Sequence, residues 1–343
     1  MKISILIPCH NEEKSIGRCV LSCLNQTRAP DQIMVVNDGS TDKSRKIIQS
    51  LSDKITYITI PVATGNKSHA QQIGLQCITG DVFIATDGDT ELEPHFVQYV
   101  EENYLAHPEL SAVGGYVRSQ KYNWLTACRA FEYAVGQNVH KLAQHHLGYL
   151  FVIPGAAGVF KTTEFLQNIP FEHDTLTEDL DFTYRLHKLN MKIKFDPRLI
   201  VYTKDPTTLQ SYINQVRRWF GGGWQCLIKH YRLAGEQPRV AFELSILYAE
   251  GVVFSVLFFM LPFISLQFYF FFILSYLFLA SIFAWYAAWV EKRWELVFVP
   301  IPYLVLMVIN SYIFLEQMVK EVILRQRNLV WFQPERFDIK TVK

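Results

Sequence analysis

The chain has 343 residues, enough for about two domains, and half of them are apolar. Its 33 basic and 32 acidic side chains nearly balance, which argues against a nucleic-acid-binding protein, and an aromatic content of 14% argues against a disordered one. The charges are unevenly placed, because 40 uncharged residues run from Gly251 to Val290 and another 20 from Leu296 to Leu315. About 20 apolar residues can cross a bilayer, so a wholly soluble protein is excluded.

Short apolar runs alternate with amphipathic stretches along the first 120 residues. In chain order, the pattern predicts strands at 3–7, 32–36, 57–60 and 81–85, with helices at 12–26, 41–51 and 67–78 between them. Strands that are apolar throughout and separated by helices are typical of a parallel sheet covered on both faces. The sequence therefore predicts a doubly wound, mostly parallel α/β domain, followed by a helical membrane region.

The predicted domains are 1–235, with an interfacial segment from about 208, a membrane region at 236–319 and a basic tail at 320–343. Candidate spans lie near 244–264, 267–289 and 297–316. Three spans would put the basic tail outside, against the positive-inside rule. An interfacial or re-entrant first segment would leave two spans and an inside tail, so both counts stay open. The chain begins with a strand rather than a signal peptide, and we expect residues 1–235 to be cytosolic.

Ligands of doubly wound sheets bind beyond the carboxyl ends of the strands. Three segments are expected at that edge: 8–12, 37–40 and 87–89. The first is not a GxGxxG loop, and the chain has no GxxxxGK[ST] sequence, which argues against dinucleotide-binding and P-loop proteins. The edge is instead rich in carboxylates.

Three carboxylates at this edge suit the binding of a metal and a nucleotide. Asp87 and Asp89 can hold a divalent ion that keeps open positions for phosphate oxygens, although Asp-Gly is also a common turn. Asp38 can accept hydrogen bonds from a ribose hydroxyl or a base N–H, or it can simply cap the helix that follows.

Two later motifs suit an acceptor. Asp179, in Thr-Glu-Asp, is placed to act as a general base, although Thr175 and Glu178 also fit a capping box. In the motif Gln-x-x-Arg-Trp at 215–219, the tryptophan can stack on a sugar and the arginine can neutralise phosphate. An interfacial helix is the alternative for this motif.

The order and spacing of these four motifs, followed by membrane spans, resemble the processive family 2 glycosyltransferases, such as cellulose, chitin, hyaluronan and poly-N-acetylglucosamine synthases. The resemblance covers about residues 3–235 and includes three smaller features. The loop with Pro8, Asn11 and Glu12 is similar to the family's first nucleotide-contacting loop. Asn66-Lys67 resembles its Gly-Lys step, and residues 154–160 resemble its small-residue acceptor strand.

The resemblance implies a GT-A domain that binds a UDP-sugar with Mg²⁺ or Mn²⁺. It implies a metal ligand at Asp89 and a catalytic base at Asp179 that inverts the anomeric centre. It implies donor-nucleotide contacts from Pro8, Asn11, Glu12, Asp38, Lys67 and Asp87. It also implies acceptor and diphosphate contacts from Gly155, Glu178, Gln215, Arg218 and Trp219.

Within the family, the sequence at 177–186 is most similar to the poly-N-acetylglucosamine synthases, so UDP-GlcNAc is the favoured donor and UDP-glucose the second. We expect a membrane enzyme that extends a β-linked polysaccharide, with a partner membrane protein or self-association to form a secretion path. Many relatives also carry spans before the catalytic domain, whereas Met1 here leads directly into a strand. That departure favours the alternative of a lipid acceptor that receives one or a few sugars. An inactive membrane scaffold or sugar-binding module is a third possibility.

Overall fold

The computed structural model describes residues 1–172, 174–232 and 236–326, and these form two compact units. Of the described residues, the first unit comprises 1–120 and 141–204, and the second comprises 121–140 and 205–326. The compact unit of the sheet thus ends before the predicted domain boundary at residue 235. Most of the predicted basic tail, from residue 327 onward, lies outside the described residues.

The first unit contains an eight-stranded mixed sheet in the order β3-β2-β1-β4-β7-β6-β8-β5. Strands β1 to β4 are parallel to one another, whereas β7 runs antiparallel to β4 and β6, and β5 antiparallel to β8. The strands are β1 (Ile3–Cys9), β2 (Gln32–Asp38), β3 (Thr56–Ile60), β4 (Val82–Ala85), β5 (Glu91–Leu92), β6 (Ala112–Ser119), β7 (Gly158–Lys161) and β8 (Ile193–Thr203). The predicted α/β class is confirmed. The alternation of helices and strands does not predict the other, mixed half of the sheet, in which β6 pairs parallel with β8 while β7 and β5 run antiparallel to their neighbours.

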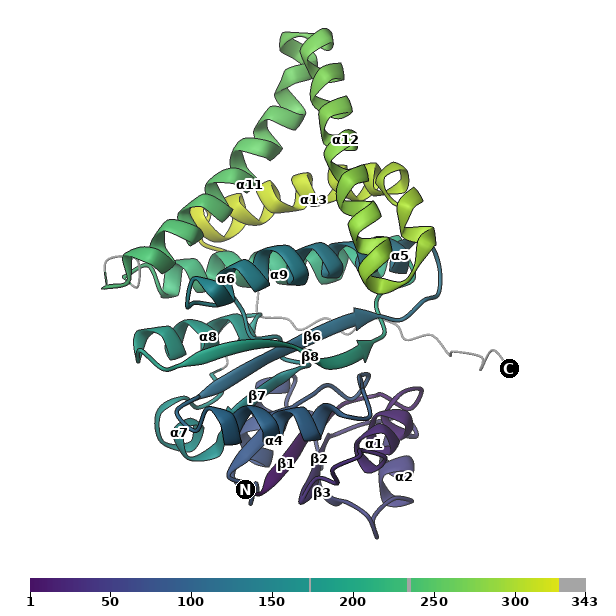
Figure 1. Ribbon diagram of the computed structural model, residues 1–343, viewed down its shortest axis with the longest axis vertical. Helices are drawn as coiled ribbons and strands as arrows, with labels where there is room; N and C mark the ends of the chain where they lie inside the picture. Colours follow the sequence, from purple (N-terminus) through teal and green to yellow (C-terminus); the bar gives the residue numbers. More distant parts are fainter. Residues whose placement is uncertain (173, 233–235, 327–343) are drawn as a thin grey trace. The chain divides into compact units, whose positions relative to one another are not determined.

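Helices connect and cover these strands (Figure 1). In this unit they are α1 (Ile16–Leu24), α2 (Ser44–Gln49), α3 (Lys67–Leu75), α4 (Phe96–Ala106), α6 (Leu142–His146), α7 (Thr162–Asn168) and α8 (Glu178–Lys188). Phe83 of β4, Phe160 of β7, Phe165 of α7 and Phe182 of α8 pack ring against ring in the core. Each is at most 1% exposed, so hydrophobic burial fixes β7 and α8 against the parallel half.

Strand β1 continues through Pro8, where the sequence predicted its end. Its pairing with β4 stops at Leu6 and Ala85, while its pairing with β2 continues to Cys9 and Asn37. The N–H that proline lacks therefore falls beyond the end of β4 and costs no ladder hydrogen bond. Helix α1 begins later than predicted, because residues 12–15 form a turn in which the Glu12 carbonyl accepts from Ser15 and Ile16.

The second unit is helical. It contains α5 (Trp124–Val135), most of the π-helical turn η1 (Gly136–Lys141), α9 (Leu209–Lys229), α11 (Pro238–Ile264), α12 (Leu266–Glu291), the 3-10 turn η2 (Trp294–Phe298), α13 (Pro300–Met318) and the π-helical turn η3 (Val319–Ile323). Figure 1 shows α11 and α12 as the two arms of a V joined at Ser265, with α9 and α13 running across its open end. Helix α9 passes without a break through Gly221, Gly222 and Gly223.

Three stretches among the described residues are helical, long and apolar enough to cross a membrane: Leu244–Ile264, Leu266–Glu291 and Pro300–Ile323. They correspond to the three segments predicted from the uncharged runs. Length and composition alone support all three, so the number that actually crosses depends on how each helix packs within its unit.

The loop after β2 depends on a left-handed glycine, which gives a first prediction. Gly39 has a φ of +57°, and a Cβ there would lie 2.2 Å from the backbone nitrogen of Ala63. We expect Gly39→Ala to lower the free energy of unfolding by at least about 2 kcal/mol, from backbone strain and this contact together. Denaturant unfolding of the purified protein measures the loss.

Gly65→Ala is the matched control, because Gly65 has a φ of +74° but a Cβ added there would have no atom within 4 Å. Gly65→Ala should lower the free energy of unfolding by about 1 kcal/mol, because only the backbone conformation is unfavourable there. Equal losses in the two variants would show that contact with Ala63 contributes nothing.

Candidate active site

The three predicted edge segments meet at the carboxyl ends of β1, β2 and β4. A Cβ on Gly88 would lie 3.3 Å from the carbonyl oxygen of Pro8 and 3.5 Å from Cγ of Glu12, so the first and third loops touch. The backbone N–H of Asn11 donates to Ser40 Oγ at 3.0 Å, and its side-chain oxygen accepts from the Thr41 N–H at 2.8 Å. The parallel register thus places these residues where the sequence predicted them.

Asp38 closes the end of β2 and holds the loop that follows β3. It is 5% exposed, and its two carboxylate oxygens accept from the Thr64 N–H at 2.8 Å and the Thr64 hydroxyl at 2.7 Å. The helix-cap alternative for Asp38 is wrong, because α2 begins only at Ser44 and Lys43 precedes it. A carboxylate has about four acceptor positions, so Asp38 can still accept from a ligand.

Lys67, at the start of α3, joins two predicted site carboxylates. Its Nζ lies 2.6 Å from Asp87 Oδ1 and 2.8 Å from Glu178 Oε1. Burial by itself lowers the pKa of Lys67, but the negative charges of Asp87 and Glu178 outweigh burial and raise that pKa. The ammonium group therefore stays protonated and links the end of β4 to the start of α8.

Asp179 lies beside this bridge. Its Oδ2 accepts from the Gly155 N–H at 3.3 Å, and a Cβ on Gly155 would lie 3.2 Å from Lys67 Nζ, so the missing side chain allows this close approach. Thr183, which the sequence did not mark, positions both partners, because its hydroxyl accepts from the Ile153 N–H at 3.0 Å and donates to the Asp179 carbonyl at 2.6 Å.

The capping-box alternative for Thr175 and Glu178 at the start of α8 is wrong. Thr177, not Thr175, precedes the helix, and its side chain makes no capping hydrogen bond. The carboxylate of Glu178, which a capping box would turn back towards the helix terminus, is paired with Lys67 instead. The acidic motif therefore serves the cluster at the sheet edge and not helix initiation alone.

Lys141 is a second cation near Asp179, and the sequence gives no sign of it. It is 7% exposed at the end of η1, with Nζ 5.5 Å from the ring centroid of Phe195. Burial lowers its pKa from 10.5 to about 8, and the negative charge of Asp179 opposes that shift. A single lysine in an amphipathic stretch carries no spacing signal, so only the fold could bring it to this carboxylate.

The residues at the edge fit a divalent cation and a polar ligand. Asp89 is 5% exposed and accepts from the Thr90 hydroxyl at 3.2 Å, and Asp87 is two residues away. The side-chain amide of Asn37 is 1% exposed and has no hydrogen-bond partner among the described residues. Oxygen ligands from one or two carboxylates, with phosphate oxygens, are what Mg²⁺ and Mn²⁺ prefer.

A different acidic group has the geometry of three cation ligands but already has a counter-charge. Glu172, Asp174 and Asp181 offer oxygens within 4.8 Å of one another. Arg185 lies 3.2 Å from Glu172 and 3.1 Å from Asp181, so a guanidinium already neutralises part of this cluster. The predicted metal residue Asp89 is not a member of it.

The Gln-x-x-Arg-Trp motif lies on α9, in the second unit. Gln215, Arg218 and Trp219 follow the i, i+3, i+4 spacing that places side chains on one face of a helix. The guanidinium carbon of Arg129, on α5, lies 4.4 Å from the Trp219 ring centroid, a cation–π contact that fixes the indole.

Arg129 is itself held by a buried polar network. It pairs with Glu132 and lies 3.5 Å from Asp205, while Tyr133 donates to Asp205 at 3.0 Å. Burial by itself lowers the pKa of Arg129, but Tyr133, Glu132 and Asp205 outweigh it and raise that pKa. The predicted donor residues, Gly155, Glu178 and Asp179 belong to the first unit, and the α9 motif belongs to the second.

Comparisons of the sequence with known proteins point to glycosyltransferases. Residues 4–162 match the model of Glycosyl transferase family 2. The chain is 26% identical over 253 residues to the poly-beta-1,6-N-acetyl-D-glucosamine synthase of Staphylococcus aureus strain COL, covering 73% of this chain and 61% of that protein. The synthase of Staphylococcus epidermidis is 27% identical over 232 residues, covering 67% and 56%. The chain thus spans less than two thirds of the length of these relatives.

Solved structures support the same fold. A mannosyltransferase from Pyrobaculum calidifontis, in complex with GDP-Man and Mn²⁺, matches with a TM-score of 0.68 at 16% identity, over 95% of this chain and 88% of that chain. S. aureus TarS in complex with UDP matches with a TM-score of 0.53 at 14% identity, over 95% and 92%. The resemblance that the motifs predicted is confirmed, and so is the fold class.

The lysine bridge gives a second prediction. Lys67→Met removes the cation between two largely buried carboxylates, and we expect the free energy of unfolding to fall by about 2–4 kcal/mol, discounted because Asp87 is 33% exposed. Adding Glu178→Gln should restore part of this loss, because one buried charge is then removed. Denaturant unfolding of the single and double variants measures both effects.

Lys192→Met is the control, because its ammonium is 67% exposed and 3.9 Å from Glu109. This change should leave the unfolding midpoint unaltered. If Lys67→Met unfolds at the same denaturant concentration as Lys192→Met, the bridge does not stabilise the protein.

Proposed function

We propose that this chain, whose residues 4–162 form a domain of glycosyltransferase family 2, is a membrane-attached inverting enzyme that transfers a sugar from a UDP-sugar to a growing β-linked polysaccharide. The observation that carries the proposal is Asp179 beside the Lys67-bridged carboxylates, at the edge where a doubly wound sheet binds its ligand. The identity to poly-beta-1,6-N-acetyl-D-glucosamine synthases supports UDP-GlcNAc as donor.

The donor would bind across the first three loops. Pro8, Asn11 and Glu12 would line the nucleotide, and Asp38 would accept from it, since its carboxylate keeps further acceptor positions beside Thr64. Lys67 and Asp87 would also contact the donor nucleotide. A Mg²⁺ or Mn²⁺ held by Asp89 would supply positive charge to the leaving group when bound.

Asp179 would take the proton from the acceptor hydroxyl. Gly155 and Leu180 donate backbone hydrogen bonds to its two carboxylate oxygens and hold the carboxylate in place. Lys67 holds Glu178 away from competing for that role. One carboxylate base suits a single in-line displacement, which turns an α-linked donor into a β-linked product.

The acceptor and the developing diphosphate charge would meet the residues of the α9 motif. Trp219, held by Arg129, offers a flat face for a sugar ring, and Arg218 offers charge to phosphate. Gln215, Gly155 and Glu178 would complete the acceptor contacts. We assign the bilayer as the site of attachment and the cytosol as the side of the catalytic domain, where UDP-sugars are available.

A lipid acceptor is the second candidate. Among the described residues, at most three helices can cross a membrane, which is few for one chain to enclose a polymer path. If a polymer is made, a membrane partner or a second copy of the chain would complete that path. If one or two sugars are added to a lipid, no such path is needed.

The role of Asp179 gives a third prediction. Asp179→Asn keeps the size and shape of the side chain but removes the base, so we expect turnover to fall by about 10²- to 10⁴-fold. UDP binding, measured by calorimetry on the same protein, should persist. Asp53→Asn, at an exposed acidic residue, is the control and should keep full turnover. Normal turnover by Asp179→Asn would remove Asp179 as the base.

The product gives a fourth prediction. Membranes enriched in the protein and supplied with Mg²⁺ and UDP-GlcNAc should yield a mass ladder that rises by one N-acetylhexosamine, and UDP-glucose should yield little. A lipid that gains one or two sugars would establish the second candidate instead. No product from any UDP-sugar, with UDP binding intact, would point to a sugar-binding module.

A further inference from the structure

Lys141 is a buried cation to which the functions proposed above give no role. It ends the π-helical turn η1, is 7% exposed, and places its Nζ 5.5 Å from the ring centroid of Phe195 on β8. Within the described part of the chain, no carboxylate forms an ion pair with this Nζ and no atom accepts a hydrogen bond from it. An ammonium group has three N–H donors, so those of Lys141 are available to a ligand.

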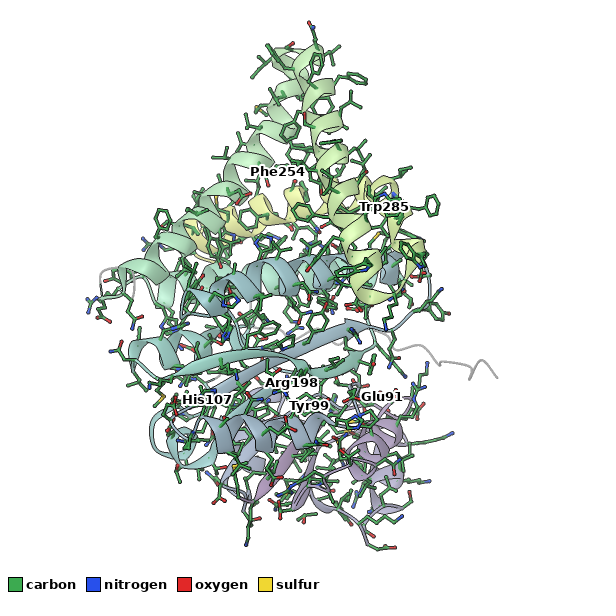
Figure 2. The ribbon with its side chains drawn as sticks, in the orientation of Figure 1. Glu91, Tyr99, His107, Arg198, Phe254 and Trp285 are labelled. Atoms are coloured by element: carbon green, nitrogen blue, oxygen red, sulfur yellow. The ribbon has the colours of Figure 1, made fainter. Side chains whose placement is uncertain are left out.

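Another cation at β8, Arg198, is in the opposite situation. Its guanidinium carbon lies 4.7 Å from the ring centroid of Tyr99 on α4, and Figure 2 shows the two residues beside each other. The side chain is 48% exposed and pairs with Asp196 at 2.8 Å and with Glu102 at 2.9 Å. Burying an ammonium group without such partners destabilises a fold, so packing alone does not account for Lys141.

The charge that acts on Lys141 is the carboxylate of Asp179. Burial lowers the pKa of Lys141 to about 8, and the negative charge of Asp179 opposes that shift, so the amine is still mostly protonated at neutral pH. The pKa of Lys67 responds instead to Asp87 and Glu178. The two lysines thus serve different carboxylates: Lys67 serves those of the bridge, and Lys141 serves the proposed base.

A ligand can reach the amine of Lys141. Several polar atoms of this chain are fully enclosed without a hydrogen-bond partner, such as Nδ2 of Asn37, but Nζ of Lys141 is not one of them. The small exposed part of Lys141 therefore includes its amine. Because this amine and the Asp179 carboxylate are close enough to interact electrostatically, a ligand bound at Asp179 can also accept a hydrogen bond from Lys141.

The charge of Asp179 favours an uncharged ligand oxygen at Lys141. A phosphate or carboxylate group at the ammonium would also approach the ionised Asp179, and like charges repel strongly where water is largely excluded. A hydroxyl or ether oxygen accepts from an ammonium group without that repulsion. A saccharide offers many such oxygens, whereas the polar end of a phosphorylated lipid is anionic.

We propose that Lys141 binds the acceptor: its ammonium group donates a hydrogen bond to an uncharged oxygen of the acceptor sugar and so brings the reacting hydroxyl of that sugar to Asp179. The inference rests on the proposed function, because it takes Asp179 as the base. In the transfer step the acceptor oxygen bonds to C1 of the donor sugar, its proton passes to Asp179, and UDP leaves with the electron pair of the broken C1–O bond. Lys141 keeps its protons, and it favours a saccharide acceptor over a phosphorylated lipid.

Lys141→Met tests this role in the whole chain, purified in detergent. Methionine has a similar length but no charge, so the variant should unfold at a denaturant concentration no lower than the parent chain. With a β-1,6-linked pentamer of N-acetylglucosamine as acceptor, kcat/KM for the pentamer should fall by about 10- to 100-fold, the effect of one hydrogen bond to a charged group. The KM for UDP-GlcNAc should be unaltered. Lys188→Met, at an exposed lysine of α8, is the control and should leave both constants unaltered.

Acceptor binding without turnover gives an independent measurement. Calorimetry of the pentamer against protein saturated with UDP should show about 10- to 100-fold weaker binding to Lys141→Met than to the parent chain. Lys141→Gln, which keeps an N–H donor but not the charge, should bind with intermediate affinity and serves as the second variant if Lys141→Met does not fold.

The outcomes separate this inference from the proposed function. Parent-like pentamer binding and kcat/KM in the Lys141 variants would overturn the role of Lys141, while loss of turnover in Asp179→Asn would still support the proposed function. A parent chain that uses a phosphorylated lipid and not the pentamer would overturn the choice of acceptor. Normal turnover by Asp179→Asn would overturn the proposed mechanism and this inference together.

Discussion

The ammonium group of Lys67 lies between carboxylates that come from distant parts of the chain, one at the end of β4 and one at the start of α8. Without a cation there, Asp87 and Glu178 would repel each other at short range in a site of reduced solvent access. The bridge also separates the two acids of the motif: Glu178 is paired with the ammonium, whereas Asp179 accepts from the backbone donors of Gly155 and Leu180. The proposed division of roles within the acidic motif therefore rests on one lysine.

A buried cation organises the second unit as well. Arg129 pairs with Glu132 and contacts the Trp219 ring, while Tyr303 of α13 donates to Glu132 at 2.9 Å. Three helices far apart in sequence, α5, α9 and α13, are thereby joined through one ion pair. Burying the charges of such a network is unfavourable, because they lose their hydration. Removing one member destabilises the protein, because it leaves a buried charge without a partner. The network around Arg129 therefore fixes the position of the Trp219 indole.

The sequence predicted the parallel half of the sheet and its ligand edge well, because hydrophobic periodicity and strand ends are local signals. It did not predict the mixed half, in which β7 runs antiparallel to β4 and brings Gly155 to Asp179, since that pairing is set by long-range packing of Phe160 and Phe182. Asp38 and Glu178 each had a plausible local role as caps, and tertiary partners, Thr64 and Lys67, replaced those roles. No sequence pattern predicted that Lys141 lies near Asp179.

Helix α9 carries the Gln-x-x-Arg-Trp motif and also binds the candidate membrane helix α13. Gln215, Arg218 and Trp219 occupy one part of its surface, while Tyr212, Arg217 and Gln225 bind α13 and η3 from the same 21 residues. The glycines of α9 allow a close approach of α11, since a Cβ on Gly223 would lie 2.7 Å from the hydroxyl of Tyr248 on α11. The three polar pairs couple the position of α13 and η3 to that of the backbone that carries the motif. A change in the packing of α13 would therefore shift Gln215, Arg218 and Trp219, the residues that we propose for the acceptor.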